Sequence, residues 1–474
     1  MGSAATKFWI EEMMMVLFNM VARRNSLAEA RHASALAWLP AMLLGAGLGL
    51  MARQAMAADA GQEEWNWHVQ ATSTTQRHGS FSSPYAGPNS LPPHESAKET
   101  VDATLFLGLR LWKGGELYLN PELDQGYGLA NTLGAAGFTS GDAYKVGHDS
   151  VYGRLHRAFL RQTLALGPDA GIVEAGANQL AGARPDERLT LTLGKISVVD
   201  LFDGNSYAHD PRADFLNWAV IDSGAFDYAA DSWGFSAGAT AEWVRGDWSL
   251  RGGFYAMSKR PNGETLDGKF GQRQWLVEAE RRFIWMGRPG AVRLLGFVTE
   301  ARMASYVDAL NLFQATGQMP TDLAPLRRFQ RKHGVAFNAE QEVAQGVGAF
   351  VRCSWNDGRT EAYDFTDINR SVAAGLQIKG SFWRQPEHTL GLALASNGLS
   401  GQARRFFAAG GLGILVGDGM LPHAANERIL EAYYKFPLGR FLSVTGDYQH
   451  LRNPAYNADR GPVSALALRL HAEY

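Results

Sequence analysis

The feature that most restricts the fold of this chain is a two-residue alternation of apolar and polar side chains, which recurs from residue 65 to the C-terminus. The final stretch, LALRLHAEY, shows it plainly: Leu468 and Leu470 share one parity, whereas Arg469 and His471 take the other. Successive side chains of a strand point to opposite faces of a sheet, so the alternation predicts strands with one apolar and one polar face. The last residue, Tyr474, is an aromatic on the apolar parity.

Sixteen segments carry this pattern, and each is near the roughly ten residues that a tilted strand needs to cross a bilayer. They cover residues 65–75, 103–112, 115–124, 156–166, 188–198, 233–245, 247–259, 272–283, 291–302, 335–343, 346–355, 371–381, 388–400, 428–436, 442–451 and 463–474. After residue 58 no apolar run approaches a transmembrane helix. A membrane location therefore requires a closed barrel, in which the strands pair all backbone polar groups.

The lengths of the connections support a barrel independently. Long connections follow the odd-numbered segments, and tight ones such as Lys113-Gly114 follow the even-numbered segments; only the connection at 167–187 breaks the rule. Outer-membrane barrels have short periplasmic turns and long external loops, whereas a soluble β-sandwich has no reason to sort its loops by parity. We therefore predict an all-β fold, a transmembrane antiparallel β-barrel of about sixteen strands.

The N-terminal region has the composition of an export signal. Residues 35–52 are apolar and follow several arginines, and Ala55-Met56-Ala57 fits a signal-peptidase site. We predict a signal peptide over 1–57. Its N-terminal region before the apolar run is either unusually long or reflects a translation start that lies further along the chain. The alternative is a single anchoring helix. Residues 58–102 are then the first strand and a polar loop, too short for the plug domain of an energised receptor, and 103–474 the remainder of the barrel.

Composition excludes several classes of protein. The formal net charge of −2 indicates no nucleic-acid partner. The single cysteine, Cys353, excludes a disulfide framework and argues against a thiolate metal site. The 53 glycines, 13 tryptophans and 15 tyrosines are typical of a β-rich protein with many turns and aromatic residues at a membrane interface.

A barrel of sixteen strands is too wide for its own side chains to fill, so a loop is expected to narrow the lumen. The candidate is the long connection at 200–231, which we name the constriction loop and which contains a single arginine, Arg212. Its acidic residues are Asp200, Asp203, Asp210, Asp214, Asp222, Asp227 and Asp231, and its aromatic residues include Tyr207, Phe215 and Trp218. Folded inward, the loop would present carboxylates and rings to the pore.

Cations on the polar parity of the strands are expected to face this loop. The predicted pore wall comprises Arg110, Arg161, Arg251, Arg293, Arg352, Lys379 and Arg469. Opposed acidic and basic rims produce a transverse field that sorts ions and orients polar solutes, although charges can also simply solvate a wide lumen. The apolar parity switches at Gly194, which predicts a β-bulge that turns Lys195 inward.

The residues of the constriction loop permit two kinds of solute. Aromatic faces stack on sugars and charged groups bind their hydroxyls, whereas carboxylate oxygens suit divalent cations.

Two motifs suggest other activities, but each lacks a necessary part. The stretch HDPRAD at 209–214 could serve as a His/Asp catalytic pair, but no nucleophile lies beside it. GGLGILVGDG at 410–419 lacks the Lys-Ser/Thr of a phosphate-binding loop. We predict that the protein is not an enzyme and needs no cofactor, and we assign no residues to a metal site.

Four long stretches carry a family resemblance. LNPELDQGYGLANTLGAAGF at 119–138, GKISVVDLFDGNSYAHDPRADFLNWAVIDSGAFDYAADSWGFSAGA at 194–239, AAGGLGILVGDGMLPHAANERILEAYY at 408–434 and NPAYNADRGPVSALALRLHAEY at 453–474 resemble the carbohydrate-selective porin (OprB-like) family of Gram-negative bacteria. A branch with the same HDPRADFLNW region is described as high-affinity manganese porins.

The resemblance runs from about residue 95 to the end of the chain. It implies an outer-membrane porin that passes small polar solutes by passive diffusion, most simply sugars, with Mn²⁺ as the alternative cargo. The expected partners are those solutes, outer-membrane lipid and the barrel assembly machinery, which reads a C-terminal strand ending in an aromatic residue. A homotrimer is a further possibility that the sequence leaves open.

Overall fold

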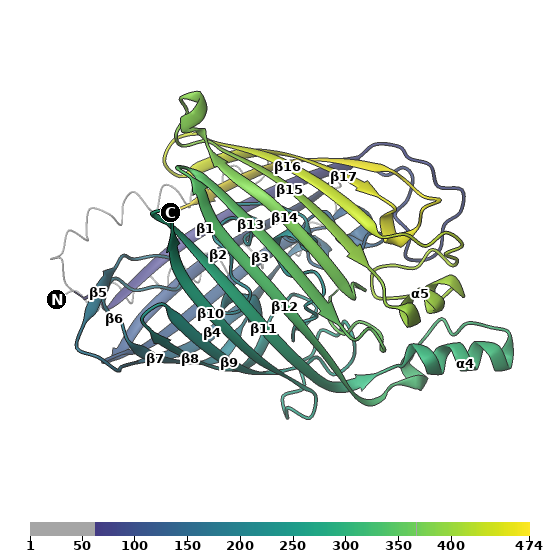
Figure 1. Ribbon diagram of the computed structural model, residues 1–474, viewed down its shortest axis with the longest axis horizontal. Helices are drawn as coiled ribbons and strands as arrows, with labels where there is room; N and C mark the ends of the chain where they lie inside the picture. The colour runs from purple at the N-terminus through teal and green to yellow at the C-terminus, as the bar shows by residue number, and fades with distance from the viewer. Residues whose placement is uncertain (1–61, 366) are drawn as a thin grey trace, which may run out of the picture. The chain divides into compact units, whose positions relative to one another are not determined.

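The computed structural model describes residues 62–365 and 367–474, so the predicted signal peptide at 1–57 lies outside the described residues. Sixteen antiparallel strands form one closed barrel (Figure 1), in which β4 pairs with β7 and β1 closes against β18. The strands are β1 (Trp65–His78), β2 (Lys98–Trp112), β3 (Gly115–Gly126), β4 (His148–Ala165), β7 (Arg188–Ile196), β8 (Ser236–Arg245), β9 (Trp248–Ala256), β10 (Arg273–Trp285), β11 (Arg288–Met303), β12 (Arg328–Ala344), β13 (Val347–Asn356), β14 (Arg370–Lys379), β15 (Thr389–Gly398), β16 (Glu427–Pro437), β17 (Leu442–Arg452) and β18 (Val463–Glu473). The predicted fold class is confirmed.

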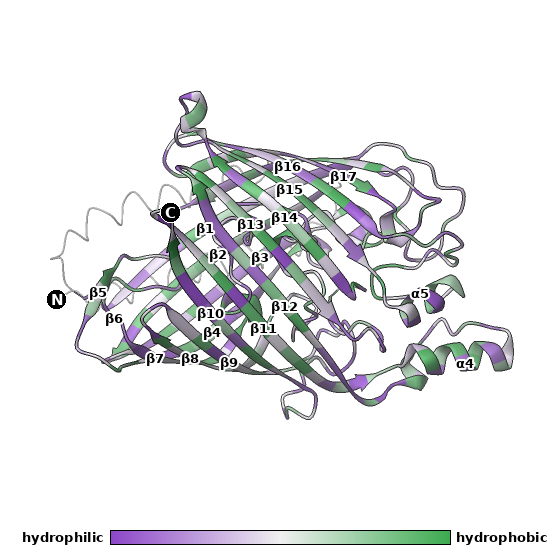
Figure 2. Cartoon of the chain, in the orientation of Figure 1, coloured by the Kyte–Doolittle hydropathy of each residue, from purple (hydrophilic) through white to green (hydrophobic). Residues whose placement is uncertain are grey.

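Hydrophilic and hydrophobic residues alternate along several strands (Figure 2), and this alternation separates the two faces of the barrel wall. Leu193 on β7 is 62% exposed and Leu468 on β18 is 52% exposed, whereas their neighbours Thr192 and Arg469 are buried inside the barrel. The apolar parity thus forms the outer surface, which lipid covers in a membrane barrel. Among the described residues, no helix is long and apolar enough to cross a membrane.

The aromatic residue at the C-terminus takes part in closing the barrel. The Tyr474 backbone N–H donates to the Val69 carbonyl at 2.9 Å, and the Val69 N–H donates to the Tyr474 carbonyl at 3.1 Å. The Tyr474 ring stacks on Trp67 of β1 with a centroid separation of 5.3 Å. The terminal residue therefore extends the seam between the first and last strands by one more pair.

Each predicted segment overlaps one barrel strand, but several strands are longer than their apolar alternation. β4 begins at His148 rather than 156, β12 at Arg328 rather than 335, and β2 at Lys98, so the predicted division at 102/103 falls within that strand. Backbone pairing continues at these ends beyond the apolar side chains, because a ladder needs only N–H and C=O groups.

The β-bulge expected at Gly194 is not present in β7. Its pairing with β4 and β8 runs without a register shift, so the predicted bulge is wrong. Gly194 instead adopts a φ of 143°, a backbone conformation that favours glycine. Lys195 nevertheless reaches the lumen, where its Nζ lies 3.1 Å from Asp231 Oδ2.

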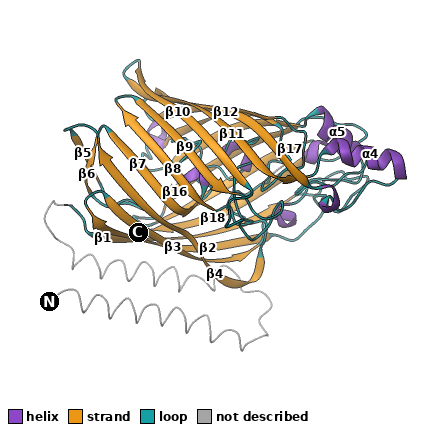
Figure 3. Cartoon of the chain, turned by 90° about the horizontal axis from the view of Figure 1, so that it is seen from below, coloured by secondary structure: helices purple, strands orange, loops and turns teal. Residues whose placement is uncertain are grey.

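The two ends of the barrel carry different structures (Figure 3). The end with the long connections carries helices α4 (Tyr306–Thr316) and α5 (Gly401–Ala408). At the opposite end the long connection between β4 and β7 forms a hairpin, β5 (Ala170–Val173) with β6 (Gly182–Pro185). The exception to the rule of alternating loop lengths is thus a separate two-stranded element.

Candidate solute pathway and constriction

The constriction loop lies inside the barrel. It belongs to the connection between β7 and β8, which includes a single 3-10 turn (Val198–Asp200) and a short helix, α3 (Trp218–Ile221). Every residue from 215 to 233 is buried. A buried irregular segment must find partners for its backbone polar groups, so the barrel wall has to supply them.

One half of the barrel wall supplies most of these partners, and we call the inner face of β10–β18 the packed wall. On β12, Asn338 donates to both the carbonyl and the carboxylate of Asp203, at 3.0 and 2.9 Å. Lys332 Nζ lies 2.9 Å from Asp227 Oδ2, and both side chains are almost wholly buried. Asp227 also accepts the backbone N–H of Tyr363 at 2.7 Å. These contacts fix the loop against one side of the lumen.

Two of the predicted wall cations hold backbone carbonyls of the loop. Arg352 on β13 donates to the carbonyls of Ala208 and Val220 at 2.7 and 2.8 Å. Arg469 on β18 donates to the Asp214 carbonyl at 2.9 Å. Both arginines are 1% exposed, so they are enclosed between the wall and the loop.

The seven predicted aspartates separate into two groups. Asp200, Asp210 and Asp222 line a cavity beside the loop. The other four are engaged by protein groups: Asp203 and Asp227 by the packed wall, Asp231 by Lys195 and by the N–H of Trp233 at 3.0 Å, and Asp214 by Gln377 at 3.1 Å. Their carboxylates stabilise the loop conformation.

The predicted aromatic residues also take different positions. Trp218 lines the cavity and stacks between Phe138 and Phe365, with centroid separations of 5.3 and 4.6 Å. Phe215 packs edge-on against rings of the packed wall. Tyr207 packs over Gly348 of β13, where a Cβ atom would lie only 2.0 Å from the tyrosine ring.

The cavity occupies the other half of the lumen and has a volume of about 1180 Å³. It lies between the constriction loop and the inner face of β1–β4 and β7–β9, which we call the channel wall. Three predicted cations line it: Arg110 pairs with Glu116 at 3.0 Å, Arg251 pairs with Glu242 at 2.8 Å, and Arg161 donates to the Asn178 carbonyl at 2.9 Å. The guanidinium groups therefore face the cavity together with their partners.

The two remaining predicted cations lie elsewhere on the wall. Arg293 of β11 pairs with Glu280 at 3.0 Å and with Glu340 at 3.3 Å. Lys379, at the end of β14, is exposed and donates to the Thr389 hydroxyl at 3.4 Å. Neither residue belongs to the lining of the cavity.

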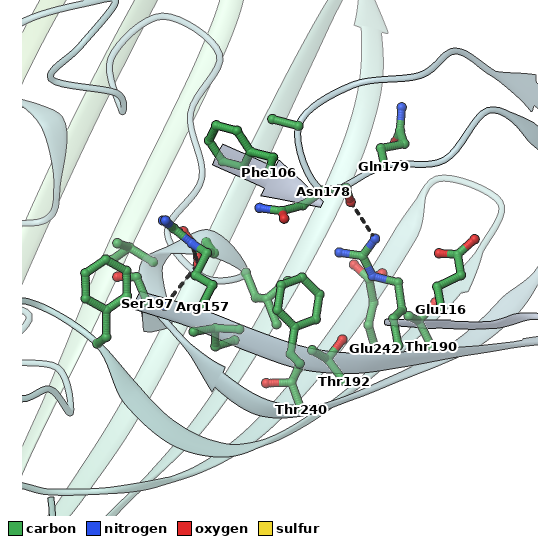
Figure 4. Close-up of a pocket in the computed structure, with 18 of the residues that line it drawn as sticks. Phe106, Glu116, Arg157, Asn178, Gln179, Thr190, Thr192, Ser197, Thr240 and Glu242 are labelled. Atoms are coloured by element: carbon green, nitrogen blue, oxygen red, sulfur yellow. Dashed lines mark hydrogen bonds and ion pairs between the residues drawn. The ribbon is translucent and has the colours of Figure 1, made fainter. Parts of the chain in front are cut away.

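Arg157 is a site residue that the sequence prediction missed. It makes a two-pronged ion pair with Asp200, with distances of 2.7 and 2.6 Å, directly across the junction of channel wall and loop. Figure 4 shows Arg157 and Ser197 at one end of the cavity, with Thr192 and Glu242 further along the channel wall. Arg157 shares strand and parity with Arg161, so the alternation itself contained the signal.

Arg212 of the constriction loop forms ion pairs with carboxylates of the channel wall and of the loop between β3 and β4. Its guanidinium lies 3.0, 2.9 and 3.1 Å from Asp102, Glu122 and Asp142. Within residues 62–365 and 367–474, one group of side chains is close enough to share a metal ion: Glu122, Asp124 and His156. Glu122 already accepts hydrogen bonds from Arg212 and from Tyr144, so the protein itself supplies the counter-charge there.

A charged pair within the loop faces the cavity. His209 Nδ1 lies 3.5 Å from Asp222 Oδ1, and His209 Nε2 lies 3.1 Å from the Val199 carbonyl. Burial by itself would lower the pKa of His209, but the Asp222 carboxylate outweighs it and raises this pKa to about 9. An imidazolium donates from both nitrogens, which suits these two acceptors.

A closed sixteen-stranded barrel with an inward-folded loop and a polar cavity beside it defines a porin. The sequence profile of the carbohydrate-selective porin, OprB family, matches residues 89–474, and the chain belongs to this family. It is therefore an outer-membrane porin of Gram-negative type for the diffusion of carbohydrates. A comparison with curated proteins gave no match.

The chain is similar to solved structures, of which the first shares its fold. OprB of Pseudomonas putida is 17% identical, with a TM-score of 0.65 over 87% of this chain and 94% of that one. The outer-membrane channel DcaP of Acinetobacter baumannii is 10% identical, with a TM-score of 0.49 over 88% and 99% of the two chains. OmpT of Vibrio cholerae is 8% identical, with a TM-score of 0.46 over 88% and 99%.

Proposed function

We propose that carbohydrates cross this barrel along the cavity between the constriction loop and the channel wall. The observation that carries the proposal is the lining of that cavity, which combines paired charges such as Arg157–Asp200 with aromatic rings such as Trp218. Paired guanidinium and carboxylate groups offer donors and acceptors to hydroxyls, and rings cover the apolar face of a sugar. No step of this passage consumes energy, and no covalent chemistry is involved.

Cations receive less support from the same lining. Of the predicted aspartates only Asp200, Asp210 and Asp222 line the cavity, and Asp200 is neutralised by Arg157. The channel wall adds Arg161, which binds a backbone carbonyl and whose positive charge raises the free energy of a divalent cation nearby, whereas Arg110 and Arg251 are paired with glutamates. Mn²⁺ therefore remains the second candidate, to be separated from sugars by experiment.

The remaining expectations about this protein are also proposals. We propose that residues 1–57 are removed on export and that the assembly machinery recognises the C-terminal strand ending in Tyr474. The exposed leucines of the outer face, such as Leu193 and Leu468, are proposed to contact outer-membrane lipid. A homotrimer is proposed only as a state to be measured, by the mass of the detergent-solubilised protein.

Conductance in planar bilayers tests the proposed cargo. The purified protein is placed in a KCl gradient to obtain its ion preference, and it is then titrated with glucose and, separately, with MnCl₂. We expect saturable reduction of the current by glucose and a weak response to Mn²⁺. Strong block by Mn²⁺ with indifference to glucose would transfer the assignment to divalent cations, and absence of any conductance would contradict both.

A further inference from the structure

The unusually long periplasmic connection between β4 and β7 enters the lumen. Residues 174–181 form the tip of the β5–β6 hairpin, and we call them the periplasmic tip. The tip is held by side chains that face the barrel interior: Asn66 of β1 donates to the Gln179 carbonyl at 2.8 Å, and Asn120 of β3 donates to the Asn178 side-chain oxygen at 2.9 Å. Arg161 of β4 donates to the Asn178 carbonyl at 2.9 Å. The tip is therefore bound to separate strands of the channel wall.

An apolar anchor fixes the same segment. Leu180 is 3% exposed, and its backbone N–H donates to the Tyr118 hydroxyl at 3.3 Å. It packs over Gly108 of β2, where a Cβ atom would lie 3.2 Å from Leu180 Cδ2 and 2.6 Å from Asn66 Oδ1. A glycine on the inner wall thus leaves the space that a leucine from a periplasmic loop fills, and burial of that leucine stabilises the inward position.

The tip presents amide groups to the cavity. Asn178 and Gln179 both line it, and Asn178 has a φ of 55°, the left-handed conformation that asparagine tolerates. The Gln179 amide also donates to the Glu174 carbonyl at 2.8 Å, so its second N–H is the one that a sugar would use. Figure 4 shows Asn178 between Phe106 and the row of Thr190, Thr192 and Thr240 on the channel wall. Asn178, Phe106 and these three threonines all belong to the lining of the cavity.

The charges around this place are of both signs, and several are paired with one another. Glu116 and Glu242 are each paired with an arginine, whereas Arg161 and Arg188 bind backbone carbonyls rather than carboxylates. Glu63, which accepts the Ala181 N–H at 2.8 Å, and Glu64 of the cavity lining add carboxylates, so the charge here is mixed, and the uncharged donors and acceptors match a dense array of hydroxyl groups.

We propose that the periplasmic tip forms a second carbohydrate-binding subsite, in series with the constriction loop, in which Asn178 and Gln179 hydrogen-bond the hydroxyls of the passing sugar. This subsite rests on the proposed pathway along the cavity. It gives the long periplasmic connection a role that a simple turn could not fill, because a short turn would end at the rim of the barrel.

Sugar titration of single channels tests the subsite. In Asn178→Gly combined with Gln179→Ala, glycine keeps the left-handed backbone accessible while both amides are removed. We expect the glucose concentration for half-maximal block to rise roughly threefold to tenfold, the loss of one or two hydrogen bonds. The cation/anion preference, measured as the reversal potential in a KCl gradient, should stay at the wild-type value because no charge changes.

The matched control is Glu174→Gln, on the same tip but exposed and outside the lining of the cavity. It should retain the wild-type response to glucose. A shift of electrophoretic mobility on heating shows that each variant has folded. Normal glucose block in the double variant would overturn the subsite alone, whereas absence of block in the wild-type protein would overturn the proposed pathway and the subsite with it.

Discussion

The packed wall and the channel wall use the same kinds of side chain for different purposes. On the packed wall, Arg352 is buried against backbone carbonyls of the constriction loop, and Lys332 is buried against the carboxylate of Asp227 in that loop. On the channel wall, Arg110 and Arg251 pair with glutamates of neighbouring strands and face the cavity. The comparison teaches that the position of a charge on the lumen parity does not tell whether it meets solute; the groups it contacts do.

The largest expected effect breaks the packed wall. Lys332→Met leaves Asp227 buried without its cation, and removal of one member of a buried pair costs about 3–5 kcal/mol. The measurement is the free energy of unfolding in urea, followed by tryptophan fluorescence in detergent micelles. Arg331→Met, at the next position and 75% exposed at its side chain, should cost less than about 1 kcal/mol. Equal losses in the two variants would contradict the buried role of Lys332.

A smaller effect concerns pH, because His209 contacts both the Asp222 carboxylate and the Val199 carbonyl. Its pKa is raised to about 9 from an unfolded value of 6.5, so protonation stabilises the folded loop. This stability is fully present below pH 6.5 and is lost as the pH rises through about 9. We expect a decrease of about 1–2 kcal/mol in the free energy of unfolding between pH 6 and pH 10.

The control for the pH effect is His209→Gln, which keeps a hydrogen-bonding side chain but does not titrate. The difference in stability between wild type and this variant should shrink as the pH rises. A difference that is constant across this range, or that grows with pH, would exclude a protonated His209 in the folded loop.

The smallest effect sharpens the description of the channel wall. Asp200→Asn removes the charge that neutralises Arg157 without changing the size of the side chain, so the cavity becomes more positive. We expect the ratio of cation to anion permeability to fall about twofold to threefold, measured as the reversal potential in a KCl gradient. Asp203→Asn removes an equal charge from the side of the loop that contacts the packed wall, and the reversal potential of this variant should remain close to wild type. Equal shifts in the two variants would remove the distinction between the walls.

Much of the fold was accessible from the sequence because strands have a strict period of two. Each predicted strand corresponds to one observed strand, and Leu193 and Leu468 lie on the outer face that their parity predicts. The connection at 200–231 is long and follows an odd-numbered strand, so it was expected to be an external loop. The width of a sixteen-stranded barrel then led to the expectation that this loop folds into the lumen. Parity with Arg161 could also have identified Arg157.

The two-residue alternation could not predict which groups each charged side chain contacts. Arg212 appeared as the one cation in an acidic loop, yet it binds Asp102, Glu122 and Asp142, which come from two strands and another loop. Asp203 and Asp227 appeared as pore carboxylates and are engaged by the packed wall. Such contacts join residues separated by tens to hundreds of positions, and local patterns carry no information on them.

The sequence by itself determined the barrel, its strand order and the two faces of its wall, since alternation and connection length are local properties that backbone pairing converts directly into a closed sheet. Only the tertiary structure decided which half of the lumen is filled and which half stays open. That choice depends on long-range complementarity, such as Leu180 over Gly108 and Asn338 against Asp203, where each group is stabilised only once its distant partner is in place.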